Sequence, residues 1–493
     1  MKNIMKILPH ILLCFALVFT SCNNTLNEIK PKSVITTASF WKTEDDASGA
    51  LNGMYVLLRN TENDLYMEGE ERSEAFEGGV YGGGTYNLYL NALTPDNTGV
   101  GSWTEYYSVI NAANALLKYV PDISFSSDDA KNAVLAQAYA MRAFVYFVMA
   151  RTWGDLVLRT DPTEGTDPSV TQKERSPVAD VFTLIKSDID EAIKLFPNDN
   201  FEAGRGNWSK PATYALKADV YLWTGKKLNG GSADFQTALD ACNEVQKSDV
   251  TLLPNFADVF DFNNKGNDEI LMAIKYNQLE ASNGYWHNWI IGSAVPSNIT
   301  QQAKDILLPV GGGQGLMVVT ALVRNQFTKD DSRRNATFFE VYTHDDSGDS
   351  TYYTNVCLKG RGEVTGGNRI FDSDYILYRY ADVVLMKAEA ENALGQDPAA
   401  EINMIRKRAY GSSYSSHVFV SGNKDFNDEM ILKERLLELL NEGKRWWDLV
   451  RFGKAFDLVP NLQSRAGQDY LLLFPISTAM LSLEPKISQN PGY

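Results

Sequence analysis

Apolar residues recur at three- and four-residue steps through most of the chain, which is the period of an amphipathic α-helix. Small residues such as Ala136 and Ala140 alternate with aromatic residues such as Phe144, and this alternation permits close packing of one helix on another. The pattern predicts helices over residues 45–58, 103–120, 129–153 and 180–196. We therefore expect a mainly α-helical protein.

Two stretches share the packing pattern of a tetratricopeptide unit, residues 214–245 and 378–406. In the first, Ala215, Ala218 and Gly225 occupy one predicted helix, and Phe235 and Ala238 occupy the next. Each such helix pair exposes an apolar face that it cannot bury alone, so stacked units share one core. The sequence therefore predicts a tetratricopeptide-like helical repeat scaffold.

Two regions lack this period. Residues 60–102 combine glycines with tyrosines and are expected to be irregular, and a long irregular stretch inside a compact body often carries function. Residues 250–375 contain short β-prone pieces at 270–274 and 338–342 among glycines and aromatic residues. We interpret about 250–375 as an irregular, loop-rich insertion with short strands, held on the helical scaffold.

The N-terminus has the composition of a lipoprotein signal. Lys2 and Lys6 precede an apolar run from residue 7 to 19, which is shorter than the roughly 20 apolar residues that a membrane span needs. The run ends in Thr20-Ser21-Cys22, so Cys22 is the predicted acylated first residue of the mature protein. The sequence thus divides into a signal peptide (1–21), a lipidated tether (22–42) and one folded domain (43–493).

Charge and cysteine content exclude several classes of protein. Removal of Lys2 and Lys6 with the signal changes the formal net charge from −16 to −18, and an acidic surface repels nucleic acid. Cys242 and Cys357 remain as the two cysteines of the mature domain, too few for a disulfide framework. The isolated histidines and these cysteines form no metal-ligand motif, so no metal and no cofactor is expected.

Motifs for catalysis are missing from the sequence as well. No pattern pairs a nucleophile with a base, and Gly311–Gly315 lacks the Lys-Ser/Thr of a phosphate loop. The acid pairs Asp330-Asp331 and Asp345-Asp346 have the residue types that a glycosidase uses, but adjacent acids in polar loops are usually solvated. We expect a binding protein and no enzyme, with a helical glycosidase or lyase and a protein-docking repeat scaffold as the alternatives.

Aromatic residues outside the helical pattern are the candidates for a ligand site. Tyr285, Trp286 and Trp289 lie beside amide and imidazole groups, and sugar rings stack their C–H faces on aromatic planes. The facing wall is predicted from the glycine–tyrosine loop of residues 78–89, with these contributors: Tyr81, Tyr86, Tyr89 and Arg72. On this hypothesis, Trp286→Ala and Trp289→Ala weaken binding with little change in melting temperature.

Several blocks, in order along nearly the whole chain, resemble the SusD/RagB family of outer-membrane nutrient-binding lipoproteins. The strongest runs from Glu434 through Glu442 to Arg451 and includes Trp446 and Trp447. This block carries acidic and basic residues at helical spacing, with Glu438 and Glu442 near Lys444 and Arg445. We expect ion pairs among such side chains to hold two helices together. The other blocks are residues 40–55, 140–156, 378–390, 402–409, 474–476 and 489–493.

This resemblance implies a surface protein that captures a nutrient oligomer, in the first place a glycan, and passes it to a SusC/RagA-type TonB-dependent transporter. It places the protein in the outer membrane of a Gram-negative bacterium, held by its lipid anchor alone and facing the cell exterior. Some members of the family resemble partners of peptide transporters, so a peptide ligand stays as the alternative. The resemblance does not assign individual ligand-contacting residues.

The anchor assignment predicts the behaviour of one variant. Cys22→Ala removes the acylation site, and because two or three acyl chains hold a lipoprotein stably in a membrane, the variant should move to the soluble fraction. Fractionation of cells followed by immunoblotting checks this. Full retention of Cys22→Ala in the membrane fraction would show that the anchor lies elsewhere.

Overall fold

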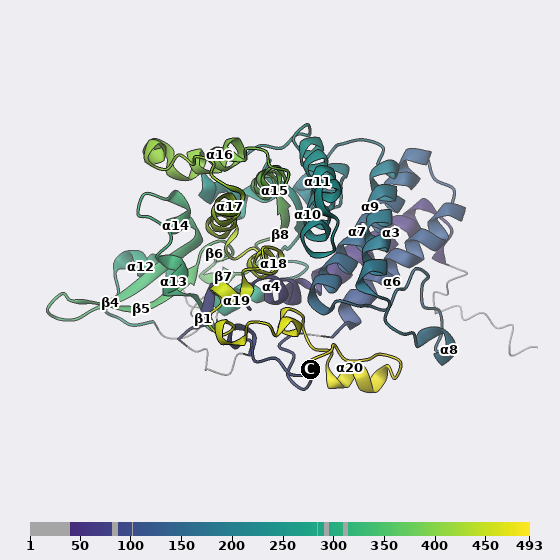
Figure 1. Ribbon diagram of the computed structural model, residues 1–493, viewed down its shortest axis with the longest axis horizontal. Coiled ribbons are helices and arrows are strands. Elements are labelled where there is room, and N and C mark those ends of the chain that lie inside the picture. Colours follow the sequence, from purple (N-terminus) through teal and green to yellow (C-terminus); the bar gives the residue numbers. More distant parts are fainter. Residues whose placement is uncertain (1–39, 81–86, 101, 283, 290–294, 309–313) are drawn as a thin grey trace, which may run out of the picture.

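The computed structural model describes residues 40–80, 87–100, 102–282, 284–289, 295–308 and 314–493. Eighteen α-helices occur within these ranges, with four two-stranded antiparallel sheets. Most of the helices stack side by side; β1 and β4 to β7 lie toward one end of the molecule, and β8 lies near its middle (Figure 1). The fold is therefore mainly helical, as predicted.

Long helices form a continuous stack in which each packs on its neighbours along the chain. Four of these helices begin after a residue whose side chain accepts a hydrogen bond from the backbone N–H three residues further on: Thr43, Ser127, Ser209 and Asn423. The stack comprises α3 (Glu44–Arg59), α6 (Thr104–Tyr119), α7 (Asp128–Trp153), α9 (Val178–Leu195), α10 (Lys210–Lys227), α11 (Gly231–Val245), α15 (Tyr380–Ala393), α16 (Ala399–Tyr410) and α17 (Lys424–Leu439).

The two predicted repeat units are the helix pairs α10–α11 and α15–α16, and α11 packs directly on α15. Gly225 of α10 lies so close to Phe235 of α11 that a Cβ at position 225 would overlap the phenyl ring. This small residue facing an aromatic ring is the contact that the repeat pattern predicted. The tetratricopeptide-like scaffold is confirmed.

Helix α7 is the longest of the helices that the structure describes. By length and composition this 26-residue helix could cross a membrane, yet 83% of its most apolar window is buried inside the protein. It packs against α6 on one side and α9 on the other. The apolar character of α7 is therefore that of a core helix.

Residues 60–102 are less irregular than expected. They contain α4 (Glu62–Glu70), β1 (Phe76–Gly78) and α5 (Asn87–Leu90). The expectation was wrong for α4 because this helix is buried on nearly all sides and carries Glu62, Glu68 and Glu70 at buried positions. Carboxylates in the core remove the alternation of apolar and polar residues by which a helix is recognised in sequence.

The region that follows α11 is closed at its base by a pair of strands. β2 (Ile270–Ile274) runs antiparallel to β8 (Tyr375–Arg379), and β8 leads directly into α15. Between them in the chain lie five more strands. β3 (Met317–Val319) pairs with β1, and the others form two hairpins: β4 (Phe338–His344) with β5 (Ser350–Cys357), and β6 (Glu363–Thr365) with β7 (Asn368–Ile370). The same region contains the helices α12 (Gln301–Leu307), α13 (Ala321–Arg324) and α14 (Ser332–Thr337). The strands predicted at 270–274 and 338–342 are both present.

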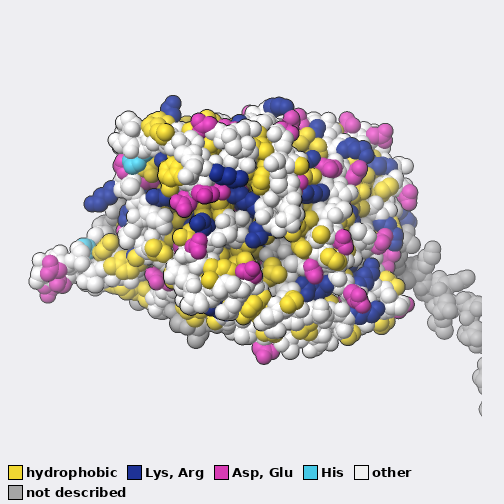
Figure 2. Space-filling view, in the orientation of Figure 1, with side chains coloured by type: hydrophobic (Ala, Val, Ile, Leu, Met, Phe, Trp, Pro, Cys, Tyr) yellow, Lys and Arg dark blue, Asp and Glu magenta, His cyan; other side chains and the backbone are white. Residues whose placement is uncertain are grey.

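The β4–β5 hairpin projects from the body of the molecule (Figure 1). Its tip carries Asp345, Asp346 and Asp349, and acidic side chains are visible at the end of this projection in Figure 2. Nearer the base, Tyr342 and Tyr352 face each other across the strands with their rings edge to face, and both are more than a third exposed.

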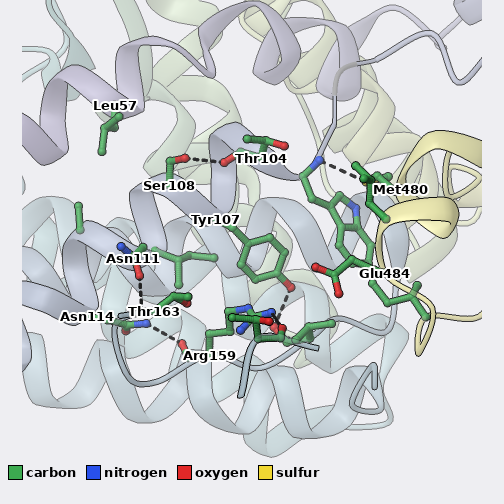
Figure 3. A pocket seen from close by; sticks show the side chains of 17 residues that line it. Leu57, Thr104, Tyr107, Ser108, Asn111, Asn114, Arg159, Thr163, Met480 and Glu484 are labelled. Atoms are coloured by element: carbon green, nitrogen blue, oxygen red, sulfur yellow. Dashed lines mark hydrogen bonds between the residues drawn. The ribbon is translucent and has the colours of Figure 1, made fainter. Parts of the chain in front are cut away.

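Short helices complete the C-terminal part. They are α18 (Arg445–Arg451), α19 (Ala455–Leu458) and α20 (Thr478–Leu483), and α8 (Pro168–Thr171) lies near α20 at the same edge of the molecule (Figure 1). A cavity of about 580 Å³ lies between α6, α20 and the segment that leads into α8 (Figure 3).

Buried ion pairs connect α17 and α18 to the rest of the stack. Arg435 contacts Asp382 of α15 and Asp448 of α18, each at 2.8 Å. Arg451 contacts Glu389 of α15 and Asp448, each at 2.9 Å. Burial alone would raise the pKa of Glu389, but the charges of Arg451 and Lys226 lower that pKa to about 2. These groups therefore stay ionised and paired inside the protein.

The structural role expected for residues 434–451 is present, with different partners. Glu438 and Glu442 contact Arg379, and Arg445 pairs instead with Glu74, next to α4. The guanidinium of Arg72 lies over the ring of Trp446 at 4.1 Å, and that of Arg151 lies over Trp447 at 4.9 Å. The sequence showed which residues are charged, but their partners come from distant parts of the chain.

Arg435→Ala should lower the free energy of unfolding by about 3–5 kcal/mol, because it removes the buried cation that Asp382 and Asp448 share and leaves them only Lys444 and Arg451 as partners. Denaturant unfolding followed by circular dichroism measures this change. Lys194→Ala is the control, since Lys194 pairs with Glu191 on the surface and such pairs contribute about 0–1 kcal/mol. Equal effects of the two substitutions would contradict the assigned role of the network.

Candidate functional site

The predicted aromatic residues Tyr285, Trp286 and Trp289 lie together on one turn of 3-10 helix, η5 (Tyr285–Trp289). Tyr285 stacks on Tyr66 of α4 with ring centroids 4.1 Å apart, and Trp289 meets Phe76 of β1 edge to face at 4.8 Å. The turn is thus fixed by aromatic contacts to α4 and β1.

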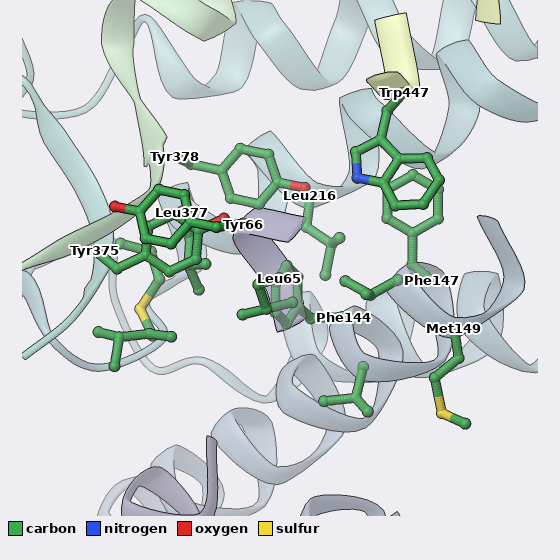
Figure 4. Close-up of a cluster of buried hydrophobic side chains, with 14 of the residues drawn as sticks. Leu65, Tyr66, Phe144, Phe147, Met149, Leu216, Tyr375, Leu377, Tyr378 and Trp447 are labelled. Carbon is green, nitrogen blue, oxygen red and sulfur yellow. The ribbon is translucent and has the colours of Figure 1, made fainter. Parts of the chain in front are cut away.

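The ring of Tyr66 is itself held from two further sides. It lies 3.9 Å from the ring of Tyr375 and meets Trp286 edge to face at 5.1 Å. Figure 4 shows Tyr66 and Tyr375 beside Leu65 and Leu377, in the same buried cluster as Trp447. A Cβ at Gly360 would overlap the indole of Trp286, so the glycine makes room for that ring.

The expectation that these three side chains offer their faces to a ligand needs correction. Tyr285, Trp286 and Trp289 are only 1%, 3% and 1% exposed. Their ring faces are occupied by other aromatic rings and by the backbone at Gly360, so in this conformation they support the surface from below. The sequence placed these aromatic residues together but could not show which way their rings point.

The described start of the glycine–tyrosine loop, at Gly79, bonds to Leu316, which in turn bonds to η5. The N–H of Gly79, just after β1, donates to the carbonyl of Leu316 at 2.6 Å. The N–H of Leu316 donates to the carbonyl of Asn288, and the N–H of Gln314 donates to that of His287. β1, η5 and the start of β3 are thereby joined through their backbones into one platform, which we call the η5 platform.

Beneath the η5 platform lie acidic residues of α4 and the turn that follows it. Burial raises the pKa of Glu71 to about 8, and it raises that of Glu70 to about 7 although Glu70 accepts backbone hydrogen bonds from Asn441, Lys444 and Arg445. Glu71 is therefore mostly protonated at neutral pH. The platform rests on groups whose ionisation is suppressed by burial.

Arg72, a predicted ligand residue, is fully buried. Its guanidinium donates to the side chain of Asn91 and to the carbonyls of Leu471 and Leu473, and it also lies over the ring of Trp446. With its donors used inside the protein, Arg72 ties the segment after α4 to the C-terminal region. The burial of Arg72 and these internal hydrogen bonds do not support the predicted ligand contact.

Tyr89 lies on α5, is partly exposed and packs against the core. Its carbonyl accepts a hydrogen bond from Asn461. Tyr81, Tyr86 and the predicted lipid-anchor residue Cys22 lie outside the described residues. Tyr89 is thus the one predicted wall residue whose position near the surface is described.

A polar groove adjoins the η5 platform at Gly360. Its larger part, about 750 Å³, lies between α12, α14 and the β6–β7 hairpin, and its smaller part, about 430 Å³, follows β4. Gln302, Asn335 and Phe339 line both parts, which therefore form one hollow that we call the β4 groove. Arg361, Glu363, Tyr342 and His344 add to its lining.

The β4 groove was missed at the sequence level, although one signal was available. In the run Phe338-Phe339-Glu340-Val341-Tyr342, Phe338 and Val341 are buried while Phe339 and Tyr342 are not. Aromatic side chains that a half-buried strand leaves partly exposed are candidates for a ligand surface. Gln302 and Arg361 also line the groove but lie far from β4 in the sequence, and no local pattern marks them as ligand residues.

The adjacent acids Asp330 and Asp331 both have structural partners. Asp331 is buried against Arg333 at 2.8 Å, and Asp330 contacts the imidazole of His417 at 2.8 Å. No cluster of three or more metal-binding side chains occurs among the residues that the structure describes. Cys242 and Cys357 are buried free thiols, and burial raises the pKa of Cys357 to about 11. The β4 groove can thus bind through stacking and hydrogen bonds.

Comparison with known proteins gives full-length matches. Residues 205–493 match the profile described as the SusD family, and residues 50–222 match one described as starch-binding associating with outer membrane. SusD-like protein P38 of Formosa agariphila is 31% identical over 512 residues, covering 97% of this chain and 96% of that protein.

Solved structures agree with these matches. B. fragilis NanU is 33% identical with a TM-score of 0.82, covering 94% of this chain and all of that one. A SusD superfamily protein from Bacteroides vulgatus is 30% identical, also with a TM-score of 0.82, covering 92% of this chain and all of its own. The similarity therefore extends over the helical stack and the insertion together.

Trp286→Ala should lower the free energy of unfolding by about 3–5 kcal/mol, because it opens a cavity beside Tyr66 and Gly360. Thermal and denaturant unfolding measure the loss. Trp41→Ala serves as the control, since Trp41 is only partly buried and its ring contacts those of Phe40 and Tyr119 just before α3. An unchanged stability of Trp286→Ala would show that the indole is not a core residue.

Proposed function

Because the chain belongs to the SusD family, we propose that it is a cell-surface protein that binds a nutrient oligomer and delivers it to a SusC-type TonB-dependent transporter. The observation that carries this proposal is a family match along nearly the whole chain, including the insertion that forms the β4 groove. The description of the second matching profile as starch-binding and associated with the outer membrane supports a glycan ligand at the bacterial surface.

The chemistry of the β4 groove supports a glycan more than a peptide. Phe339 and Tyr342 offer partly exposed rings on which a sugar can stack its C–H face. Gln302, Asn335 and Glu363 offer amides and a carboxylate for hydroxyl groups. A peptide-binding member of the same family is the alternative, and it would use these groups for backbone amides.

We place the ligand on the η5 platform and along the β4 groove that adjoins it. The backbone bonds among β1, η5 and β3 fix the platform, and Gly360 under Trp286 connects it to the wall that carries Arg361. An oligomer needs an extended surface of this kind, and the groove provides about 750 Å³ in its larger part alone. The binding energy then comes from several weak contacts in a row.

Tyr342→Ala and Arg361→Ala should each weaken binding of the preferred oligosaccharide about tenfold, which corresponds to ~1.4 kcal/mol. Both side chains are exposed, so melting temperatures should change little. Titration calorimetry with panels of oligosaccharides and of oligopeptides measures the affinities. Tyr414→Ala and Lys407→Ala are the matched controls, because they lie on η6 (Gly411–Ser416) and α16, away from the groove lining.

Selective loss of peptide binding in the same two variants would favour the alternative ligand. Unchanged affinity of both variants for every ligand would place the site elsewhere on the molecule. Turnover of a bound oligosaccharide, abolished by one Asp or Glu substitution, would replace the binding role with a glycosidase. Delivery is tested by extracting the tagged protein from native membranes: a copurifying TonB-dependent β-barrel is expected, and its absence would contradict the transport step.

A further inference from the structure

The β6–β7 hairpin brings two arginines to one wall of the β4 groove. Arg361 precedes β6, Arg369 lies in β7, and both line the larger part of the groove. The guanidinium of Arg369 donates from Nη1 to the carbonyl of Arg361 at 3.0 Å and from Nη2 to that of Ile306 at 2.6 Å. Gly362 has a φ of +67°, and a Cβ there would overlap the carbonyl oxygen of Ile370. This glycine lets the backbone beside Arg361 lie directly against the backbone beside Arg369.

Neither of these two positive charges is neutralised by the protein. Neither guanidinium makes an ion pair with a carboxylate among the described residues, and the internal stretches outside the described ranges contain no Asp or Glu. Arg361 is exposed, whereas Arg369 is only 9% exposed. Every other buried arginine that the structure describes contacts a carboxylate, with the exception of Arg72, which lies outside the groove. Arg369 is thus a buried charge in the groove wall that lacks a counterion.

The arrangement favours an anion in front of the two arginines. Burial, together with the charge of Arg361, lowers the pKa of Arg369. A buried charge without a partner is costly, and a negative group placed beside Arg361 offsets the charges of both side chains. A guanidinium binds planar oxyanions through two parallel N–H···O bonds, and the exposed Arg361 is free to do so.

We infer that the ligand of the β4 groove is an acidic oligosaccharide, whose carboxylate or sulfate group binds Arg361 in front of Arg369. This inference rests on the proposed function of the groove and names the class of glycan that it takes. The acidic group contacts Arg361 directly, while Arg369 contributes its charge from within the wall. An uncharged glycan would leave both guanidinium groups without a counterion.

Three carboxylates restrict where the negative charge of the ligand can lie. Asp261, Asp305 and Glu363 line the same part of the groove. Asp261 accepts a hydrogen bond from the N–H of Asn263, and Asp305 accepts one from the side chain of Gln301, each at 2.8 Å, but these neutral donors leave the carboxylates charged. A polymer with an acid on every unit would meet them, whereas neutral units would offer them hydroxyl groups. We therefore expect acidic units that are separated by neutral ones.

Saturation-transfer difference NMR on the full mature chain tests the preference with sugars that differ in one charge. Glucuronate, galacturonate and N-acetylneuraminate are each compared with their methyl ester, and galactose 6-sulfate is compared with galactose, so that the carboxylate and sulfate arms are distinguished. At least one acidic sugar should bind about tenfold more tightly than its neutral counterpart, as expected for a charge-assisted hydrogen bond. High salt should reduce this difference, because it screens the exposed Arg361.

Arg361→Gln should give the acidic sugar and its neutral counterpart equal affinity, with an unchanged melting temperature because Arg361 is exposed. Arg369→Gln should reduce the preference as well, with melting temperature as the check on folding. Arg465→Gln is the matched control, since Arg465 also lacks an ion pair among the described residues, donates to the carbonyl of Asn91 and lies outside the groove lining. It should bind like the unmodified protein.

Equal affinity of the unmodified protein for all the acidic sugars and their neutral counterparts would overturn the inference, as would an undiminished preference in folded Arg361→Gln. Binding of neutral oligosaccharides alone, weakened by Tyr342→Ala, would overturn it while leaving the proposed function in place. Tighter binding of an Asp-containing tripeptide than of any acidic sugar would assign the two arginines to a peptide ligand and overturn it too. Binding of no oligosaccharide and no peptide would contradict the proposed function itself.

Discussion

Arg379 lies where the insertion rejoins the helical stack, and it contacts Glu269, Glu438 and Glu442 at 2.7 Å each. Glu269 directly precedes β2, Arg379 ends β8, and Glu438 belongs to α17, so one guanidinium joins the base of the insertion to the C-terminal helices. Glu438 also contacts Arg333 and Arg408. Buried ion pairs of this kind add little to the net free energy of folding. Any other arrangement of the chain is strongly disfavoured, however, because displacing one partner leaves an unpaired charge inside the protein.

The position of the proposed site follows from this network. Lys359 donates to Glu442 and to the carbonyl of Glu438, and Gly360 beside it receives the indole of Trp286. Glu70 of α4 accepts three backbone N–H groups at the start of α18, while Tyr66 of the same helix carries the stack of Tyr285. The η5 platform therefore rests on α4, and α4 rests on α18. The loops above can differ in sequence while their support stays fixed.

The helical part of this arrangement was predictable from sequence, because a 3.6-residue period and the Gly225–Phe235 pattern are local properties. The fold class, the paired repeats and two of the strands followed from such patterns. Helix α4 did not, since its buried glutamates have partners far along the chain, as Glu68 has in Thr152 and Glu70 has in Lys444, which is 374 residues away. The orientation of Trp286 likewise depends on a residue that is distant in sequence, Gly360, which leaves room for the indole. Local patterns located the aromatic cluster, but only the folded chain shows that its rings point inward and that the open surface lies along β4.

The central claim is that an oligomeric nutrient lies along the β4 groove and the η5 platform. Hydrogen exchange followed by mass spectrometry, with and without a bound oligosaccharide, tests it most directly. The account predicts slower exchange in residues 300–307, 335–344 and 358–369, with the helices α10 and α11 unchanged. Protection confined to α10 and α11, with the β4 groove unaffected, would contradict it.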